Sequence, residues 1–108
     1  MANHIIAADR KDLFYFGAIY YRCFCLKKLG RDEEATKAYK EANSMYRLHT
    51  MEHPSAIDVY LYRAMVLKDM EEYDKSLELL DFILGLGAEI AEVYLCKAEI
   101  FEATGRAS

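Results

Sequence analysis

Three cysteines and three histidines are the residues best suited to metal binding or nucleophilic chemistry in this chain of 108 residues. Cys23 and Cys25 lie two positions apart, about 200° around a helix, so they cannot hold the same metal ion. We expect both to be buried free thiols. His49 and His53 can face each other if a helix extends that far, but two histidines without a third ligand make a weak site. The sequence therefore predicts no metal and no cofactor.

Arrangements typical of catalysis are also missing from the sequence. It has no Ser–His–Asp arrangement, no glycine-rich phosphate loop and no Cys-x-x-Cys pair. The acidic pairs Glu33-Glu34 and Glu71-Glu72 are typical of solvated helix starts. We expect a protein that is not an enzyme.

Composition and charge exclude further classes. A chain with 54% hydrophobic and 30% charged residues is too apolar for a disordered tail, and its length fits one small domain. No apolar run approaches the roughly 18 residues of a membrane-spanning helix, and the first residues show no signal-peptide pattern. A net charge of −4 disfavours nucleic acid as a partner. The odd number of cysteines fits reduced thiols and a cytoplasmic location.

The chain repeats itself. Val59-Tyr60-Leu61 recurs as Val93-Tyr94-Leu95, 34 residues later, and each copy is followed by a basic residue and an alanine. A third copy starts upstream at Tyr20, with an offset of 41 residues. The seven extra residues are about two helical turns, which we place between Met45 and His53.

Apolar spacing, glycines and caps divide the chain into five predicted helices, over residues 11–29, 31–48, 55–70, 73–85 and 88–104. Gly30 ends the first helix, Gly85 to Gly87 end the fourth and Gly105 ends the fifth. Ser55 is a candidate N-cap of the third. We therefore predict an all-α single domain over residues 1–108, with repeat one at about 16–53, repeat two at about 57–90 and a half repeat or capping helix at about 91–108.

Each unit has the same pattern of small and large residues. They are Ile19, Cys23, Leu26, Gly30, Ala35, Tyr39 and Ala42 in the first unit, Tyr60, Ala64, Leu67, Tyr73, Ser76, Leu80 and Ile83 in the second, and Tyr94, Ala98, Phe101 and Gly105 in the half unit. This 34-residue helix–turn–helix pattern resembles the tetratricopeptide repeat (TPR) over about residues 16–105. The resemblance implies a right-handed superhelix of about two and a half units. Cys23, Ala64 and Ala98 are expected where the paired helices approach closely.

In TPR proteins the first helix of each unit lines a concave surface, and the resemblance implies the same here. The stripe one residue past the large apolar position lies on one helical face. The predicted groove residues are Tyr20, Phe24, Lys27, Leu61, Tyr62, Met65, Lys68 and Leu95, with Glu99 and Glu102 at the far end. Such a strip fits an amphipathic helix or an apolar peptide. The alternative is that these residues are buried by one another or by further repeats.

Basic residues stand where the TPR family usually has leucine, and Ala88 stands where it has a loop proline. The basic residues are Arg22, Arg63 and Lys97. They could grip an acidic segment together. We favour the interpretation that each reaches water or pairs with an acid such as Glu34 or Asp74.

Some TPR domains clamp acidic chaperone tails with Lys, Arg and Asn on the concave face. At the matching positions this chain has Tyr20, Phe24, Tyr62, Glu92 and Cys96. None of these side chains donates the charge-assisted hydrogen bonds that a carboxylate needs, so we expect no tail binding.

The sequence therefore predicts a non-catalytic module for protein–protein interaction, with a protein or peptide as its partner. The alternative is a fragment of a larger TPR scaffold subunit of an enzyme complex. Residues 61–106 look similar to the auxiliary-subunit repeats of N-terminal acetyltransferase complexes. The unfinished third unit also leads us to expect a homodimer through exposed terminal helix faces.

Overall fold

The computed structural model describes residues 2–105, with side chains described from residue 15 onward. Within that range the chain forms five helices and no strands. They are α1 (Ala2–Lys28), α2 (Asp32–Glu52), α3 (Ile57–Asp69), α4 (Tyr73–Gly85) and α5 (Ala91–Thr104). The predicted all-α class is confirmed. No helix of the described part is both long and apolar enough to cross a bilayer.

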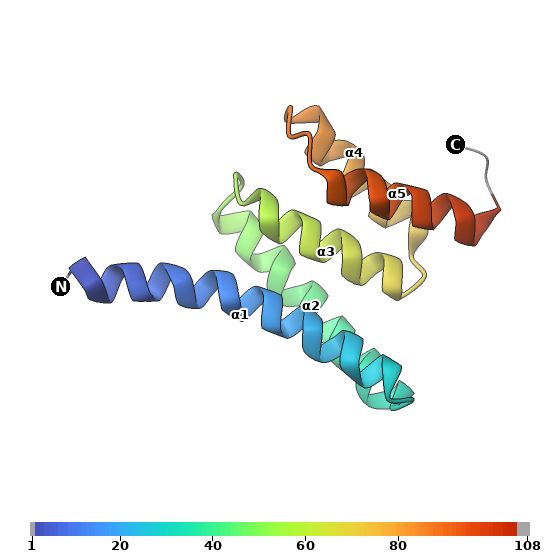
Figure 1. Ribbon diagram of the computed structural model, residues 1–108, viewed down its shortest axis with the longest axis horizontal. Coiled ribbons are helices and arrows are strands. Elements are labelled where there is room, and N and C mark those ends of the chain that lie inside the picture. Colours follow the sequence, from blue (N-terminus) through green and yellow to red (C-terminus); the bar gives the residue numbers. More distant parts are fainter. Residues whose placement is uncertain (1, 106–108) are drawn as a thin grey trace.

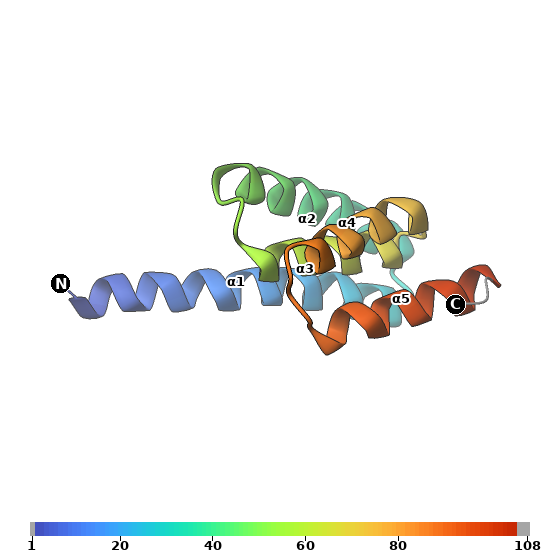
Figure 2. The same ribbon diagram turned by 90° about the horizontal axis from the view of Figure 1, so that it is seen from above.

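Helices α1, α3 and α5 lie next to one another in a row, and α2 and α4 pack against the same side of that row (Figures 1 and 2). Each of α1 and α3 is followed by a short turn and a helix that packs against it. The row brings together helices that are far apart in the sequence, because α1 contacts α3 and α3 contacts α5.

The helix boundaries differ from the predicted ones in three places. α1 begins at Ala2, nine residues early, because no glycine or proline precedes Gly17 to interrupt it. α2 continues to Glu52, so the extra turns lie where we placed them. α5 begins only at Ala91, because Ile90 has extended backbone angles. The predicted N-cap at Ser55 is wrong, since Ala56 takes that position and makes no side-chain cap.

The turns after α1 and α3 close in the same way. Gly30 has φ 79° and Glu71, 41 positions later, has φ 64°. In both turns the residue that follows donates its N–H to the carbonyl of a leucine, Leu26 at 3.0 Å and Leu67 at 2.8 Å. The third equivalent position, Gly105, has φ 70° at the end of α5. The three first helices of the units therefore end alike, although one of the three positions is not a glycine.

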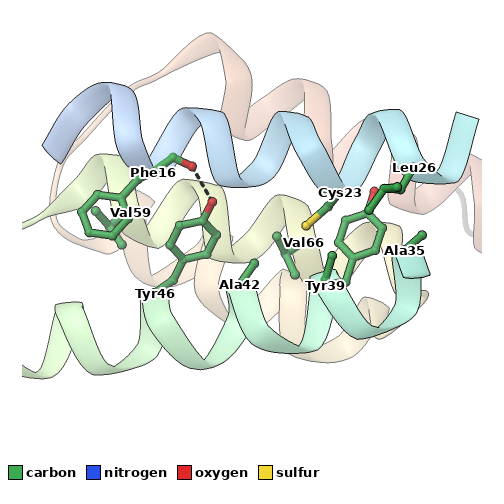
Figure 3. Packing of buried hydrophobic residues seen from close by; sticks show 10 residues of the cluster. Phe16, Cys23, Leu26, Ala35, Tyr39, Ala42, Tyr46, Val59 and Val66 are labelled. Carbon is green, nitrogen blue, oxygen red and sulfur yellow. Dashed lines mark hydrogen bonds between the residues drawn. The ribbon is translucent and has the colours of Figure 1, made fainter. Parts of the chain in front are cut away.

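The first core cluster lies between α1, α2 and one face of α3 (Figure 3). Its members include Phe16, Cys23, Leu26, Ala35, Ala38, Tyr39, Ala42, Tyr46, Val59 and Val66. The alanines of α2 allow close approach to α1. Tyr46 is fully buried, and its hydroxyl donates a hydrogen bond of 2.6 Å to the carbonyl oxygen of Phe16 (Figure 3).

The second core cluster joins α3, α4 and α5. Its buried members are Ala64, Leu80, Ile83, Val93, Cys96 and Ile100. Ser76 is fully buried where α4 meets Ala64, and its hydroxyl donates to the carbonyl oxygen of Ala64 at 2.7 Å. The predicted close approach at Ala64 is therefore confirmed.

Two predictions about single residues are wrong. Ala98 is exposed, because α5 turns Val93, Cys96 and Ile100 toward α3 and α4 and leaves the opposite face open. Cys25 is exposed, because α1 likewise packs on one side only. Cys23 is buried as expected.

Candidate functional site

Part of the predicted groove, from α1 and α3, forms one hollow of about 810 Å³, which we call the aromatic groove. It is lined by Gly17, Ala18, Tyr20, Tyr21, Phe24, Tyr62 and Met65. Four of these, Tyr20, Phe24, Tyr62 and Met65, were predicted from the sequence. The hollow belongs to the outer surface, where Phe24 is 37% and Tyr21 68% exposed.

A second hollow of about 530 Å³, which we call the polar hollow, adjoins the aromatic groove along Tyr20 and Phe24. It holds the two predicted lysines, Lys27 and Lys68, beside Asp69 and Glu99. The predicted strip is thus divided into an apolar part and a charged part.

The structure does not bring the remaining predicted residues into either hollow. Leu61 is half-buried and packs against the second core cluster. Leu95 is 54% exposed on α5. Of the expected far end, Glu99 lines the polar hollow and Glu102 is exposed.

The aromatic groove has a wall of contacting rings, which we call the aromatic wall: Tyr62, Tyr20, Phe24 and Tyr21. Neighbouring ring centroids along this order are 6.4, 6.2 and 6.5 Å apart. At its inner end the ring of Tyr62 stacks on the buried ring of Tyr46, at 5.9 Å. The wall is therefore anchored in the core and presents its outer rings in a fixed arrangement.

Asp69 holds the wall in place. The hydroxyls of Tyr20 and Tyr39 each donate a hydrogen bond of 2.8 Å to Oδ2 of this carboxylate. Lys27 Nζ donates to the backbone carbonyl of the same residue at 2.8 Å. Burial, together with the carboxylate, raises the pKa of both tyrosines well above the usual value. Sequence reasoning missed Asp69, because a single acid at a helix end carries no pattern.

Gly17 was also missed by the sequence reasoning. A Cβ atom at this position would lie 3.1 Å from the hydroxyl oxygen of Tyr62 and 3.7 Å from its Cζ. The glycine therefore lets α3 place this ring against α1. A glycine in the middle of a long helix was the available signal, since it costs about 1 kcal/mol relative to alanine.

Charges around the polar hollow are largely paired. Lys68 Nζ lies 3.1 Å from Oε2 of Glu99. Burial alone lowers the pKa of Lys68, but the hydrogen bond and charge of Glu99 outweigh it and the pKa is raised. Lys28 Nζ lies 5.2 Å from the centroid of Phe24, a cation–π contact at the rim of the aromatic groove.

The basic series does not form a continuous ladder. Lys97 Nζ pairs with Asp81 of α4 at 2.8 Å, and Arg63 Nε donates to Oδ1 of Asn43 of α2 at 2.9 Å. Burial lowers the pKa of Arg63. Arg22 is exposed. Arg22 and Lys97 fit the interpretation that we favoured, although the acid beside Lys97 differs from those named, whereas the half-buried Arg63 bonds to an amide rather than to an acid.

Histidines and buried cysteines show no arrangement for chemistry. The rings of His49 and His53 lie 4.5 Å apart, as expected from a helix that extends that far. Within residues 15–105 no group of three or more His, Cys, Asp or Glu side chains could hold a metal ion. Burial raises the pKa of the Cys23 and Cys96 thiols, which keeps them protonated and unreactive.

Comparison with known proteins found no match: no family model, no curated protein and no solved structure is detectably similar to this chain.

Proposed function

We propose that this chain is a TPR-type helical-repeat module that binds an apolar peptide or amphipathic helix of a partner protein in the aromatic groove. The module has no catalytic role in this proposal. The observation that carries it is the aromatic wall, which is exposed at Phe24 and Tyr21 and lines a hollow of about 810 Å³ together with Met65.

The repeat interpretation rests on equivalent positions with equivalent burial. Val59 and Val66 of α3 are buried toward the preceding helices, and so are Val93 and Ile100 of α5, 34 residues later. The left-handed residues that end α1, α3 and α5 follow the same spacing. This spacing supports the proposal that the five helices are two repeat units and a half unit, as the TPR resemblance implies.

The chemistry of the groove defines the segment that it would bind. Its rim and wall consist of rings and a methionine, and the Tyr20 hydroxyl already donates to Asp69. The hollow therefore offers mainly ring and methionine surface, with the hydroxyls of Tyr21 and Tyr62 as its polar groups. Apolar and aromatic side chains, spaced three or four residues apart on a helix, match such a surface. Methionine adapts its shape to the partner, and fixed rings lose little entropy on binding.

A display experiment tests the proposal. Random peptides displayed on phage would be selected against the immobilised full chain, and the enriched peptides would be synthesised and titrated by fluorescence polarisation. We expect enriched sequences with large apolar residues at helical spacing. Phe24→Glu and Met65→Glu each place a charge in the apolar hollow and should weaken binding at least about tenfold, which is about 1.4 kcal/mol.

Leu48→Glu is the matched control. Leu48 is 62% exposed on α2 and lines neither hollow, so the same exchange there should leave peptide affinity and helical circular dichroism unchanged. Equal affinity of the Phe24→Glu and wild-type chains for the selected peptides would reject the aromatic groove as the binding site.

A further inference from the structure

The outer helices α1 and α5 each leave one face without a helix neighbour in the part of the chain that the structure describes. The middle helix α3 shows what a covered helix looks like. Its Val59 and Val66 pack into the first core cluster, and its Ala64 packs into the second, so two faces are buried. α1 and α5 use only one of these two faces each, and the open ones lie at opposite ends of the row (Figure 1).

The open face of α5 has the same kinds of residues as the faces of α1 and α3 on which another helix packs. Ala98 is equivalent to Cys23 and Ala64, which are 1% and 0% exposed, yet Ala98 itself is exposed. Tyr94 and Leu95 beside it are 53% and 54% exposed. Elsewhere in the chain, the helix that covers this position brings small residues, such as the alanines of α2. The face around Ala98 therefore suits a helix with small residues.

The open face of α1 provides small residues at that spacing. Ala18 and Cys25 are equivalent to Val59 and Val66 but are exposed, with Tyr21 between them. They lie seven residues apart, as do Ala35 and Ala42, the residues with which α2 packs against α1. α1 can thus approach another helix as closely as α2 does.

The two outer helices also carry opposite charges. Residues 15–28 of α1 include Arg22, Lys27 and Lys28 and no acid, and Lys27 already donates to the backbone carbonyl of Asp69. α5 carries Glu92, Glu99 and Glu102 against one lysine; Glu99 already pairs with Lys68 of α3, and the lysine pairs with Asp81. Among the described side chains, neither Arg22 nor Glu102 has an ion-pair partner within its own chain.

We propose that copies of this chain associate head to tail, with the α1 face formed by Ala18, Tyr21 and Cys25 packed on the α5 face formed by Tyr94, Leu95 and Ala98 of the next copy. In this contact α1 of one copy takes the place on α5 that α2 takes on α1 and α4 takes on α3. Because the two faces are different and lie at opposite ends, a dimer leaves one of each face open, and assemblies grow past the dimer with concentration. The α1 face shares Ala18 and Tyr21 with the lining of the aromatic groove, whereas Cys25 lies outside it.

Sedimentation velocity of the full chain, from low micromolar to submillimolar concentration, provides the first test. We expect the average mass to rise past that of a dimer, and to fall when salt screens the charges. Ala98→Arg adds a cation opposite the basic face, and Cys25→Glu adds an acid opposite the acidic face. Each should weaken association at least about tenfold, whereas Ser44→Arg, on the exposed surface of α2, should not.

Mixing the two blocked variants is the decisive experiment. Ala98→Arg retains an intact α1 face and Cys25→Glu an intact α5 face, so each alone associates weakly but the mixture pairs through the two intact faces. A wild-type chain that remains monomeric throughout overturns the proposal, and so does a mixture that does not pair. Glu102→Lys, at an exposed site, replaces Ala98→Arg if that variant loses helicity. Cys25 lines neither hollow, so Cys25→Glu should weaken association and leave peptide affinity unchanged, which separates this contact from peptide binding.

Discussion

The hydroxyl of Tyr20 donates a hydrogen bond of 2.8 Å to Oδ2 of Asp69, which joins the aromatic wall on α1 to the last residue of α3. Tyr39 of α2 donates to the same oxygen at the same distance. One carboxylate therefore links three helices at the point where the aromatic groove meets the polar hollow.

Removal of the Asp69 side chain should destabilise the fold and loosen the wall. Asp69→Ala leaves two hydroxyl donors without an acceptor, one of them on the almost fully buried Tyr39, so we expect a loss of about 2–3 kcal/mol in the free energy of unfolding. Tyr20→Phe and Tyr39→Phe each remove one bond and should cost about 1 kcal/mol. Urea unfolding followed by circular dichroism measures all three. Equal stability of Asp69→Ala and wild type would show that the carboxylate does not join the helices.

Alkaline pH should destabilise this protein more than a chain with ordinary tyrosines. Burial, with Asp69 acting on the first two, raises the pKa of Tyr20, Tyr39 and Tyr46 in the folded state. A raised pKa means that the folded state keeps its protons where the unfolded chain releases them. The stabilising contribution is therefore complete below the unfolded value of about 10 and is lost as pH rises above it.

Urea midpoints measured from neutral pH to about pH 11 provide the test, because unfolded tyrosines titrate near pH 10. The midpoint should fall across the alkaline part of that range, and the Tyr20→Phe/Tyr39→Phe double variant should show a shallower fall. If the urea midpoints of the double variant and the wild type fall in parallel, Tyr20 and Tyr39 are not the cause of the alkaline loss of stability.

The periodicity of the sequence predicted the number and kind of helices because apolar spacing within a helix is a local property. It also placed the extra turns of α2 correctly, since the offset between the copies fixes their length. It failed for α5, where the apolar positions Tyr94 and Ala98 matched the other units but are exposed. Similarity between the repeat copies shows which face of α5 resembles a buried helix face of α1 or α3. It does not show whether another helix packs on that face.

The candidate site was predicted in part for the same reason. The TPR resemblance implied that α1 and α3 line one surface, helical spacing then selected Tyr20, Phe24 and Met65, and the structure brings these three to one hollow. Asp69 could not be predicted and Gly17 gave only the signal of a glycine inside a helix, because their roles arise from contacts between α1 and α3 that only the packed structure defines.

Glu71 should be a site at which glycine stabilises the protein. Its φ of 64° is left-handed, a region that costs a residue with a side chain about 1–2 kcal/mol, and the equivalent position in the first unit is Gly30. Because glycine also loses more entropy on folding, we expect a net gain of about 1 kcal/mol for Glu71→Gly. Thermal and urea unfolding measure it. Glu72→Gly, at φ −90°, is the control and should lower stability; a gain of the same size at both positions would disprove the strain argument.

Gly17 and Tyr62 should be energetically coupled. Alanine in a helix interior is favoured over glycine by about 1 kcal/mol, but at Gly17 its Cβ would lie 3.1 Å from the Tyr62 hydroxyl oxygen. We expect Gly17→Ala to gain little or nothing in the wild-type chain, because the ring must shift to make room. In a Tyr62→Phe background, which lacks that oxygen, the same substitution should stabilise by about 1 kcal/mol more, a coupling that a double-mutant cycle in urea measures.

Gly85→Ala, where a Cβ meets no atom within 4 Å, is the control and should give the same gain with either residue at position 62. Additive effects of Gly17→Ala and Tyr62→Phe would show that the close approach does not constrain the ring, and that the glycine is not what sets this wall of the groove.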